Sequence, residues 1–342
     1  MRVLIDINHP AHVHLFKNLY FELRKRNVFV LVAVTQKDIA KLLLEKYNIP
    51  YVNMGSYGRS TLSKAINLPL KSIYLRYLAW KHKIDVLFGV SFRVSHASFL
   101  TKKKSYVLDD TEHAKQEILL YKYFATKIVT PKSFEISLGR KHIRYNGFHE
   151  LAYLHPNYFK PKLETLKSLG LKESDVFFVL RFVGWEAMHD IGHNGISIEN
   201  KRRLIKLLNP LGRVIISSEK KLDKEFEKYR MSICPTKMHD LLYYCSLFVG
   251  DGGTMASESA VLGTPSVHVS SLDAGVLKEQ VNYGLLTSLR NDQELINIVE
   301  KKLPTIAEEK EQNRLIVKKM LEEQQDVTSF MLDLVLRNKI SN

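Results

Sequence analysis

Over the first 150 residues, short aliphatic and β-branched runs alternate with longer stretches whose apolar positions recur at helical spacing. The short runs predict strands at Val3–Ile7, Val28–Val34, Asp85–Val90, Ser105–Leu108 and Lys127–Thr130. The first two longer stretches, Leu15–Arg26 and Ile39–Tyr47, predict helices. This alternation is typical of βαβ units, in which helices cover both faces of a parallel sheet.

A second series of the same kind follows a proline-containing segment. The first series ends near Arg144–Phe148, and Leu154–Pro161 predicts a linker. Further strands are expected at Val176–Val183, Arg213–Ser217, around Ile233, Leu247–Gly250 and Ser266–Val269. The charged tail from Gln293 to Lys339 is helical by its period.

The pattern therefore predicts an α/β protein with two Rossmann-like, doubly wound domains, residues 1–150 and 151–320. A C-terminal helix at 321–342 follows, and its return to the N-terminal domain is left open. In such folds ligands bind beyond the carboxyl ends of the strands, so the expected site is the cleft between the domains.

Composition narrows the class of protein and of partner. The chain has 342 residues, 51 Lys and Arg against 36 Asp and Glu, and a formal net charge of +15. Hydrophobic residues make up 45%, which excludes disorder, collagen and coiled coil as descriptions of the whole chain. The excess charge suggests an anionic partner: nucleic acid, a phospholipid surface or a phosphorylated small molecule. Nucleic acid is the least favoured, because no zinc pattern, aromatic-rich recognition strand or basic tail occurs.

Cysteine usage and the first residues suggest a cytoplasmic setting. With only Cys234 and Cys245, the chain can build neither a disulfide framework nor a thiolate zinc site. No apolar run approaches the ~20 residues of a membrane span. Arg2 places a charge before any signal-like apolar region could form, so we expect structure from the first residues onward.

A glycine turn in the second series carries the clearest chemical pattern. The expected strand Leu247–Gly250 is followed by Gly252 and Gly253, Thr254 and an expected helix. Backbone N–H groups at such a helix N-terminus can approach a phosphate, and the helix dipole favours its charge. Glu258, just over one turn into the helix, can accept hydrogen bonds from two ribose hydroxyls. The plainer interpretation is a tight strand-to-helix turn with Glu258 as a solvated helix residue.

This segment resembles the nucleotide-sugar motif of GT-B-type enzymes. The similar families are the N-acetylglucosaminyltransferase that makes the lipid-linked peptidoglycan precursor and the non-hydrolysing UDP-N-acetylglucosamine 2-epimerases. In both, a glycine turn precedes a helix whose Glu holds the ribose, followed by Gly-x-Pro. The spacing from Glu258 to Gly263-Thr264-Pro265 matches that pattern.

The resemblance extends more weakly along the chain. Residues 55–113 look like the same region of that transferase, Tyr145–Phe148 resembles its hinge, and Met238–Leu242 resembles the helix that closes over the base. With its opening Asp6-x-x-His9-Pro10-x-His12, the chain is identified as a member of an uncharacterised prokaryotic family of the GT-B superfamily.

Three histidines, His9, His12 and His14, follow the first strand, where we expect a loop that faces the cleft. His12 and His14 would chelate a metal only if that loop were extended, and the resemblance implies no metal, since GT-B enzymes do not need one. The resemblance places His12 where an imidazole can take the proton of the acceptor hydroxyl or donate a hydrogen bond to the leaving sugar. Ordinary loop-to-helix capping by these histidines is the competing interpretation.

Asp109, Asp110 and Glu112 form the densest acidic cluster, at the end of a strand and beside His113. One of these carboxylates can serve as general base if its like-charged neighbours raise its pKa. Alternatively, Asp110 or Thr111 simply caps the next helix.

Arg181 ends the first strand of the second series, where an Arg can clamp a diphosphate and stabilise it as it leaves. A surface Arg at a strand end is the alternative. Glu186, His189 and Asp190 follow in an expected loop over the substrate, and Ser217–Lys221 is expected to line the base pocket.

The stretch Arg59–Lys83 interleaves six Lys and Arg residues with apolar and aromatic ones. A basic helix with an apolar face and interfacial aromatics lies on anionic membranes. An ordinary helix whose apolar stripe is core gives the same period, so both interpretations stay open.

Together these features favour a metal-independent glycosyltransferase with a nucleoside-diphosphate sugar donor, UDP-linked by resemblance, and a saccharide or lipid-linked acceptor. No cofactor is expected, because the nucleotide sugar is itself a substrate. The alternative is a 2-epimerase, although Ser91 and Arg93 in the second loop and Arg181–Glu186 match its motifs poorly. A protein that binds an anionic polymer is the third hypothesis.

Overall fold

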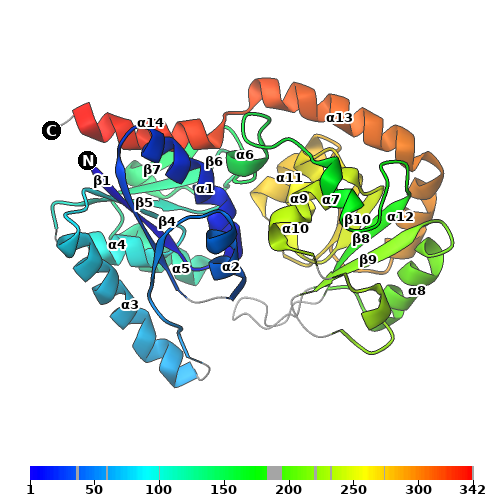
Figure 1. Ribbon diagram of the computed structural model, residues 1–342, viewed down its shortest axis with the longest axis horizontal. Coiled ribbons are helices and arrows are strands. Elements are labelled where there is room, and N and C mark those ends of the chain that lie inside the picture. The colour runs from blue at the N-terminus through cyan, green and yellow to red at the C-terminus, as the bar shows by residue number, and fades with distance from the viewer. Residues whose placement is uncertain are drawn as a thin grey trace. The chain divides into compact units, whose positions relative to one another are not determined.

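The computed structural model describes residues 1–35, 38–58, 61–99, 101–182, 195–218, 222–231, 233–272 and 274–340. They form two compact units (Figure 1). Unit 1 combines Met1–Tyr158 with Gln324–Asn342, and unit 2 is Phe159–Glu323. The sequence places these boundaries after residues 150 and 320. No helix in the described ranges is long and apolar enough to cross a membrane.

Unit 1 is built on a parallel sheet of seven strands in the order β3-β2-β1-β4-β5-β6-β7. The strands are β1 (Arg2–Ile7), β2 (Phe29–Val34), β3 (Tyr51–Asn53), β4 (Val86–Gly89), β5 (Lys104–Leu108), β6 (Lys127–Pro131) and β7 (His142–Tyr145). The strand order reverses at β1, where Asp6 lies in register with Ala33 of β2 and Gly89 of β4. In doubly wound sheets, the carboxyl ends of strands at such a switch point hold ligands.

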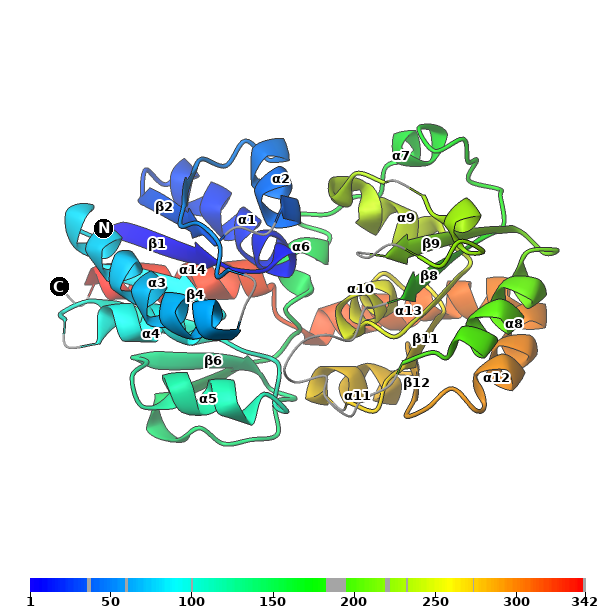
Figure 2. The same cartoon turned by 90° about the horizontal axis from the view of Figure 1, so that it is seen from below.

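Helices cover both faces of this sheet. They are α1 (Pro10–Lys25), α2 (Asp38–Lys46), α3 (Thr61–Lys81), α4 (Phe92–Ser98), α5 (Lys115–Lys122), α6 (Leu151–Leu154), α14 (Val327–Ile340) and the 3₁₀ turn η1 (Gly139–Lys141). α3, α4 and α5 share one core with the sheet through Leu75, Val94 and Ile118. They form one layer, nearest the viewer in Figure 2, while α1 and α14 cover the opposite face.

Unit 2 has a five-stranded parallel sheet in the order β12-β11-β10-β8-β9. Its strands are β8 (Phe177–Phe182), β9 (Arg213–Ser218), β10 (Leu247–Gly250), β11 (Ser266–Val269) and β12 (Thr287–Leu289). Its helices are α7 (Leu163–Lys167), α8 (Ile198–Leu208), α9 (Met238–Tyr244), α10 (Gly253–Val261), α11 (Gly275–Asn282), α12 (Leu295–Lys302) and α13 (Ile306–Glu323), with 3₁₀ turns η3 (Glu227–Tyr229), η4 (Pro235–Lys237) and η5 (Leu303–Thr305). α8 and α12 pack together and bury Leu204 and Val299 against the sheet.

The C-terminal segment is tied to unit 1 by backbone hydrogen bonds. The N–H of Gln325 donates to the carbonyl of Asn146 at 2.6 Å, and the N–H of Asn146 donates to Oε1 of Gln325 at 2.9 Å. The hydroxyl of Thr328 donates to the carbonyl of Ala152 at 2.8 Å. Helix α14 then packs on α1 and α6.

Two expectations about the elements are wrong. The predicted strand at Ile233 does not form, because Pro235 begins η4 and β9 has only an isolated bridge to Arg230 there. The first helix begins at Pro10, so the histidine segment is helical and is not an extended loop. The short edge strands β3, β7 and β12 went unpredicted, since three or four residues are too few to show an alternating pattern.

Candidate functional site

The opening motif of unit 1 builds a buried ion pair. The guanidinium of Arg93 donates to Asp6 from Nη2 to Oδ1 at 2.8 Å and from Nε to Oδ2 at 2.9 Å. Asp6 and Arg93 are 1% and 0% exposed. Ser91 Oγ donates to Asp6, and Arg93 also donates to the hydroxyl of Thr35. Burial raises the pKa of Asp6 and the Arg93 charge opposes that rise. The pair fastens β1 to α4 at the switch point, a link that the sequence pattern did not reveal.

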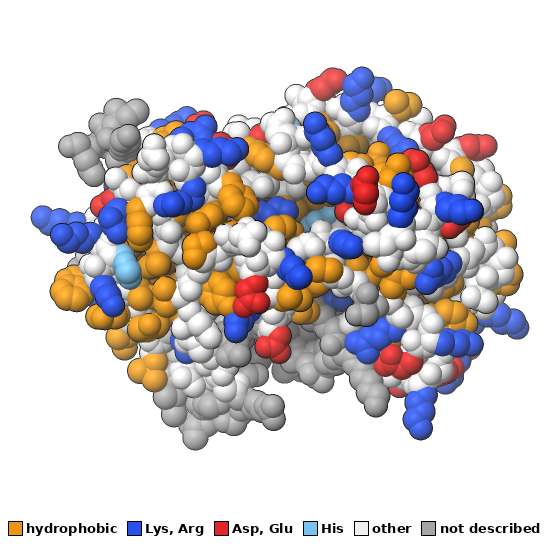
Figure 3. Space-filling view, in the orientation of Figure 1, with side chains coloured by type: hydrophobic (Ala, Val, Ile, Leu, Met, Phe, Trp, Pro, Cys, Tyr) orange, Lys and Arg blue, Asp and Glu red, His pale blue; other side chains and the backbone are white. Residues whose placement is uncertain are grey.

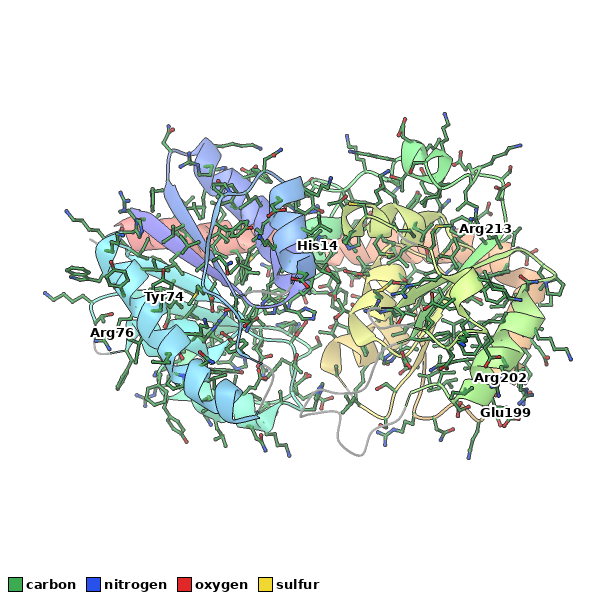
Figure 4. All side chains as sticks on the ribbon, turned by 60° about the horizontal axis from the view of Figure 1, so that its bottom comes forward. His14, Tyr74, Arg76, Glu199, Arg202 and Arg213 are labelled. Atoms are coloured by element: carbon green, nitrogen blue, oxygen red, sulfur yellow. The ribbon has the colours of Figure 1, made fainter. Side chains whose placement is uncertain are left out.

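The three histidines of the motif have different positions. His9 is the N-cap of α1, where its Nδ1 accepts from the N–H of Ala11 at 3.2 Å, and Pro10 takes the first helical position. The capping interpretation is therefore confirmed for His9. His14 is buried on α1 (Figure 4), with its ring 5.4 Å from that of Tyr153.

His12 and His14 cannot act as a chelating pair in this geometry. They are two residues apart on a helix and therefore point in different directions. In the described part of the chain, no group of three or more His, Cys, Asp or Glu side chains has the arrangement of a metal site.

His12 lies in the first turn of α1 beside a second imidazole that the sequence did not single out. His149, which follows β7, approaches Asp110, which follows β5, with 2.9 Å between Nδ1 and Oδ2. His149 is 7% exposed, and its Nε2 has no hydrogen-bond partner among the described residues. Three elements thus bring two imidazoles and a carboxylate to the carboxyl edge of the unit 1 sheet.

The charges of this cluster set its protonation. Burial alone would raise the pKa of Asp110, but the charge of His149 and its hydrogen bond bring it down to about 2. Burial opposes the charge on His149, but Asp110 raises the pKa of that imidazole above its usual value. The pKa of His12 falls well below 6.5, first through burial and then through the charges of His9 and His149. These shifts favour the neutral form of His12 and the charged form of His149 beside the Asp110 carboxylate.

In contrast to its neighbour Asp110, Asp109 has a raised pKa. Tyr121 donates its hydroxyl to Oδ2, and the N–H of Thr111 donates to Oδ1 at 2.9 Å. Burial is the first cause that brings the pKa of Asp109 to about 7, and the neighbouring charge of Asp110 adds less. The expected effect of like-charged neighbours is thus present but secondary.

The structure decides the capping interpretation of this cluster and gives Glu112 a contact of its own. The capping interpretation of Asp110 and Thr111 is wrong, because α5 begins at Lys115 and its N-cap residue is Ala114. Glu112 is buried, and its Oε1 accepts from the backbone N–H of Glu135 at 3.3 Å. That contact ties Glu112 to the segment after β6.

In unit 2, the predicted glycine turn lies at the carboxyl end of β10. Gly252 is the N-cap of α10 and Gly253 its first residue, and no side chain in the described residues caps this end of the helix. Thr254 is exposed in the first turn. The N–H groups of this turn, together with the helix dipole, form a site suited to a phosphate.

Arg181 lies beside this turn. It is in register with Gly250 of the neighbouring strand β10, and a Cβ at Gly250 would come within 2.9 Å of the Arg181 Cβ. Glycine is therefore required for β8 and β10 to pair here. The half-buried Arg181 side chain donates from Nη1 to Ser217 Oγ at 3.2 Å. Glu186, His189 and Asp190, like residues 219–221, lie outside the described residues.

Glu258 faces the interior of unit 2. Its side chain is buried, and Oε1 lies 3.0 Å from Nε2 of His239 on α9. The interpretation of Glu258 as a solvated helix residue is therefore wrong. The sequence pattern identified the helix that carries His239 but not this contact.

The Gly-x-Pro segment has a conformational role. Gly263 adopts φ +75 and ends α10, with its N–H donating to the carbonyl of Ala260 at 2.9 Å. Thr264 donates its hydroxyl to the carbonyl of Leu242 on α9 at 2.6 Å. The segment thus returns the chain into β11 and fixes α9 beside α10.

Residues 1–339 match the family described as "Protein of unknown function (DUF354)". The chain belongs to this family. The uncharacterized protein MJ0665 of Methanocaldococcus jannaschii is 26% identical over 314 residues, which cover 88% of this chain and 91% of that protein.

Solved structures show the fold. The UDP-GlcNAc 2-epimerase from Neisseria meningitidis, bound to UDP-GlcNAc, aligns with a TM-score of 0.66 over 100% of both chains at 14% identity. The glycotransferase of kitacinnamycin aligns with a TM-score of 0.60 over 98% of both chains at 12% identity. This member of the family therefore has the GT-B fold, with two helix-covered parallel sheets, as the sequence predicts.

Proposed function

We propose that this chain is a metal-independent glycosyltransferase that uses a nucleoside-diphosphate sugar, UDP-linked, as donor. The acceptor is a hydroxyl of a saccharide or of a lipid-linked saccharide, as in the synthesis of cell-surface polysaccharide or glycolipid. The observation that carries the proposal is the turn at Gly252 and Gly253, uncapped by any described side chain, with the buried Glu258 on the same helix. The structural likeness to an epimerase bound to UDP-GlcNAc and to a glycotransferase supports it.

Unit 2 holds the donor in this proposal. The N–H groups of Gly253 and Thr254 donate to the diphosphate, and the carboxylate of Glu258 accepts from the ribose hydroxyls. Arg181, on the strand beside the turn, stabilises the negative charge that develops on the leaving diphosphate.

Unit 1 supplies the base. Neutral His12 accepts the proton of the acceptor hydroxyl as its oxygen bonds to the anomeric carbon, while the bond from that carbon to the diphosphate oxygen breaks. His149, held as a cation by Asp110, orients the acceptor through the Nε2–H that has no partner among the described residues. Asp109, with its pKa near 7, is the second candidate for the base.

The second candidate function is a nucleotide-sugar 2-epimerase that uses the same donor site. The likeness to the Neisseria enzyme and the protonatable Asp109 favour it, since epimerisation needs a group that exchanges a proton with carbon. The loop position that carries a carboxylate in the epimerase motif has Ser91 and Arg93 here, and Arg93 is engaged by Asp6. We therefore rank the transferase first.

Titration calorimetry against UDP, GDP, ADP, CDP and TDP tests the donor site. The proposal expects UDP to bind most tightly and Glu258→Ala to weaken that binding. The anionic-polymer hypothesis would be favoured instead if none of the five nucleotides binds detectably and the protein is retained on nucleic acid or another polyanion in a salt-dependent way.

Incubation with UDP-GlcNAc alone in D₂O separates the two enzymes. A 2-epimer or deuterium at C2 without any acceptor would overturn the transferase assignment. With an acceptor found by screening saccharides and lipid-linked saccharides, the transferase expects His12→Ala to lower kcat about 100-fold or more.

A further inference from the structure

Helix α3 carries two apolar stripes, and only one is in the core. Leu75, Leu78 and Ala79 pack into the core of unit 1, which confirms the core interpretation of the stretch Arg59–Lys83 for that side. A second stripe at helical spacing is exposed: Leu70 51%, Ile73 62%, Tyr74 38%, Tyr77 45% and Trp80 71%. Exposed apolar surface of this extent marks an interaction site in soluble proteins.

The aromatic residues of the second stripe form a row. The rings of Tyr74 and Tyr77 are 6.1 Å apart, and those of Tyr77 and Trp80 are 6.2 Å apart. Lys81 Nζ lies 5.8 Å from the centre of the Tyr77 ring. Tyr74 and Arg76 of α3, labelled in Figure 4, are both exposed. The stripe therefore mixes apolar rings with cations, a combination that suits a membrane interface.

The neighbouring helices of the same layer extend the apolar surface. Phe99, at the end of α4, and Leu119, Leu120 and Tyr123 on α5 are 40–66% exposed. Nine of the seventeen exposed large hydrophobic residues in the described ranges thus belong to α3–α5. We call these nine the outer face: Leu70, Ile73, Tyr74, Tyr77, Trp80, Phe99, Leu119, Leu120 and Tyr123. Figure 3 shows hydrophobic side chains gathered with Lys and Arg over α3 and α4.

The exposed charge around α3 is mostly positive, and α5 adds one exposed acidic residue, Glu117. Residues 67–107 contain eight Lys and Arg residues and one acidic residue, Asp85. Asp85 accepts from the N–H of Arg2 at 2.7 Å and lies 4.0 Å from the N-terminal amine. Arg76, Lys81 and Lys83 are exposed. The partner of this face must therefore be apolar and anionic.

We infer that the outer face docks on a membrane surface that contains anionic phospholipid. The apolar side chains enter the boundary between headgroups and acyl chains, and Arg76, Lys81 and Lys83 pair with lipid phosphates. A second copy of this chain is the poorer occupant, because a two-fold interface would bring these cations together with few acidic partners. Docking is independent of the proposed reaction, so a failure of either leaves the other to be judged on its own test.

Co-sedimentation with vesicles tests the inference on the full chain. We expect binding to phosphatidylcholine vesicles that contain phosphatidylglycerol, weakened by salt, and little binding to phosphatidylcholine alone. The pair Tyr77→Ser with Trp80→Ser lowers partitioning about tenfold or more, because two interfacial rings are lost. The pair Arg76→Glu with Lys81→Glu abolishes the preference for the anionic vesicles.

A matched control lies in unit 2. Leu211 and Leu315 are 53% and 58% exposed, and the pair Leu211→Ser with Leu315→Ser leaves vesicle binding unchanged if the outer face is the site. Circular dichroism melting of every variant verifies folding. Equal loss of binding in the control pair and the α3 pair overturns the assignment.

Trp80 reports docking directly. The chain has two tryptophans, so a Trp185→Phe background leaves Trp80 as the only one. Its emission shifts to the blue on addition of anionic vesicles and is quenched by brominated acyl chains, if the inference is correct. The inference is overturned if the emission of Trp80 does not shift and the parent protein is a dimer that the pair Tyr77→Ser with Trp80→Ser dissociates. The outer face would then bind a second copy of this chain.

Discussion

His239 Nε2 lies 3.0 Å from Glu258 Oε1, and each residue is 4% exposed. The contact joins α9 to α10 in the interior of unit 2, next to the glycine turn at Gly252. A carboxylate held on one side by an imidazole has a fixed orientation, which is the condition for recognising a ribose with two hydroxyls.

We expect Glu258→Gln to weaken UDP binding about tenfold, because a neutral amide loses the charge-assisted hydrogen bonds to the ribose. His239→Asn weakens UDP binding less, about threefold, since Glu258 keeps its charge but loses its orienting partner. Titration calorimetry measures both values. Glu300→Gln on the exposed side of α12 is the control, and an unchanged Kd for Glu258→Gln would remove Glu258 from the donor site.

The His149–Asp110 pair predicts an imidazole that titrates above its usual value. In Asp110→Asn the largest causes of the raised pKa are gone, while burial still opposes the charge against the smaller effects of Glu150 and Asp109, so the pKa of His149 falls. Proton NMR of the imidazole resonances across a pH series follows this change. A His149 resonance with the same midpoint in both proteins would contradict the ion pair.

The same pair makes stability depend on pH in two directions. Asp110, with its pKa lowered to about 2, contributes stability above its unfolded value, and that contribution is lost as pH falls toward about 2. His149, with its pKa raised, contributes stability below its unfolded value, and that contribution is lost as pH rises through its folded pKa. Urea unfolding across this range should show both losses reduced in Asp110→Asn.

His268 in β11 predicts a loss of stability in mild acid. It is 2% exposed, neither ring nitrogen has a partner among the described residues, and burial lowers its pKa to about 4. In the unfolded chain His268 takes up a proton near pH 6.5, whereas in the folded chain it stays neutral until about pH 4. At about pH 5 this difference lowers the free energy of unfolding by about 2 kcal/mol. In His268→Leu this loss should vanish. Urea unfolding of the parent and of His268→Leu at about pH 7 and about pH 5 measures this change in the free energy of unfolding. An equal decrease in both proteins would contradict the buried neutral imidazole.

The Asp6–Arg93 pair predicts non-additive energetics. Arg93→Met leaves the Asp6 carboxylate buried without its cation and should lower the free energy of unfolding by about 3–5 kcal/mol. Asp6→Asn with Arg93→Met removes both charges and should recover part of that loss. Chemical denaturation of the two single variants and the double variant completes the cycle. Additive losses would show that the two side chains do not act as a pair.

Local patterns in the sequence predicted the structure of residues 247–265 well. The strand Leu247–Gly250, the turn at Gly252 and Gly253 and the segment Gly263-Thr264-Pro265 occur as expected, because glycine and proline restrict backbone conformation wherever they stand. The apolar period by itself failed for the histidine segment. There Pro10 and the His9 cap begin the helix earlier than its apolar period indicates.

The sequence by itself determined the two α/β series, the basic charge and the glycine-turn motif, because periodicity and backbone preference are properties of neighbouring residues. Only the tertiary structure decided which distant residues meet. Asp6 and Arg93 are 87 positions apart, and His149 reaches Asp110 from the segment that follows β7, a strand that the pattern did not reveal. Their contact follows from the order of β1, β4, β5 and β7 in one sheet, and strand order depends on the packing of the whole unit. Likewise, the period of α3 left open whether its apolar residues face the core or a membrane, and only packing showed that one stripe lies in the core while a second stays exposed.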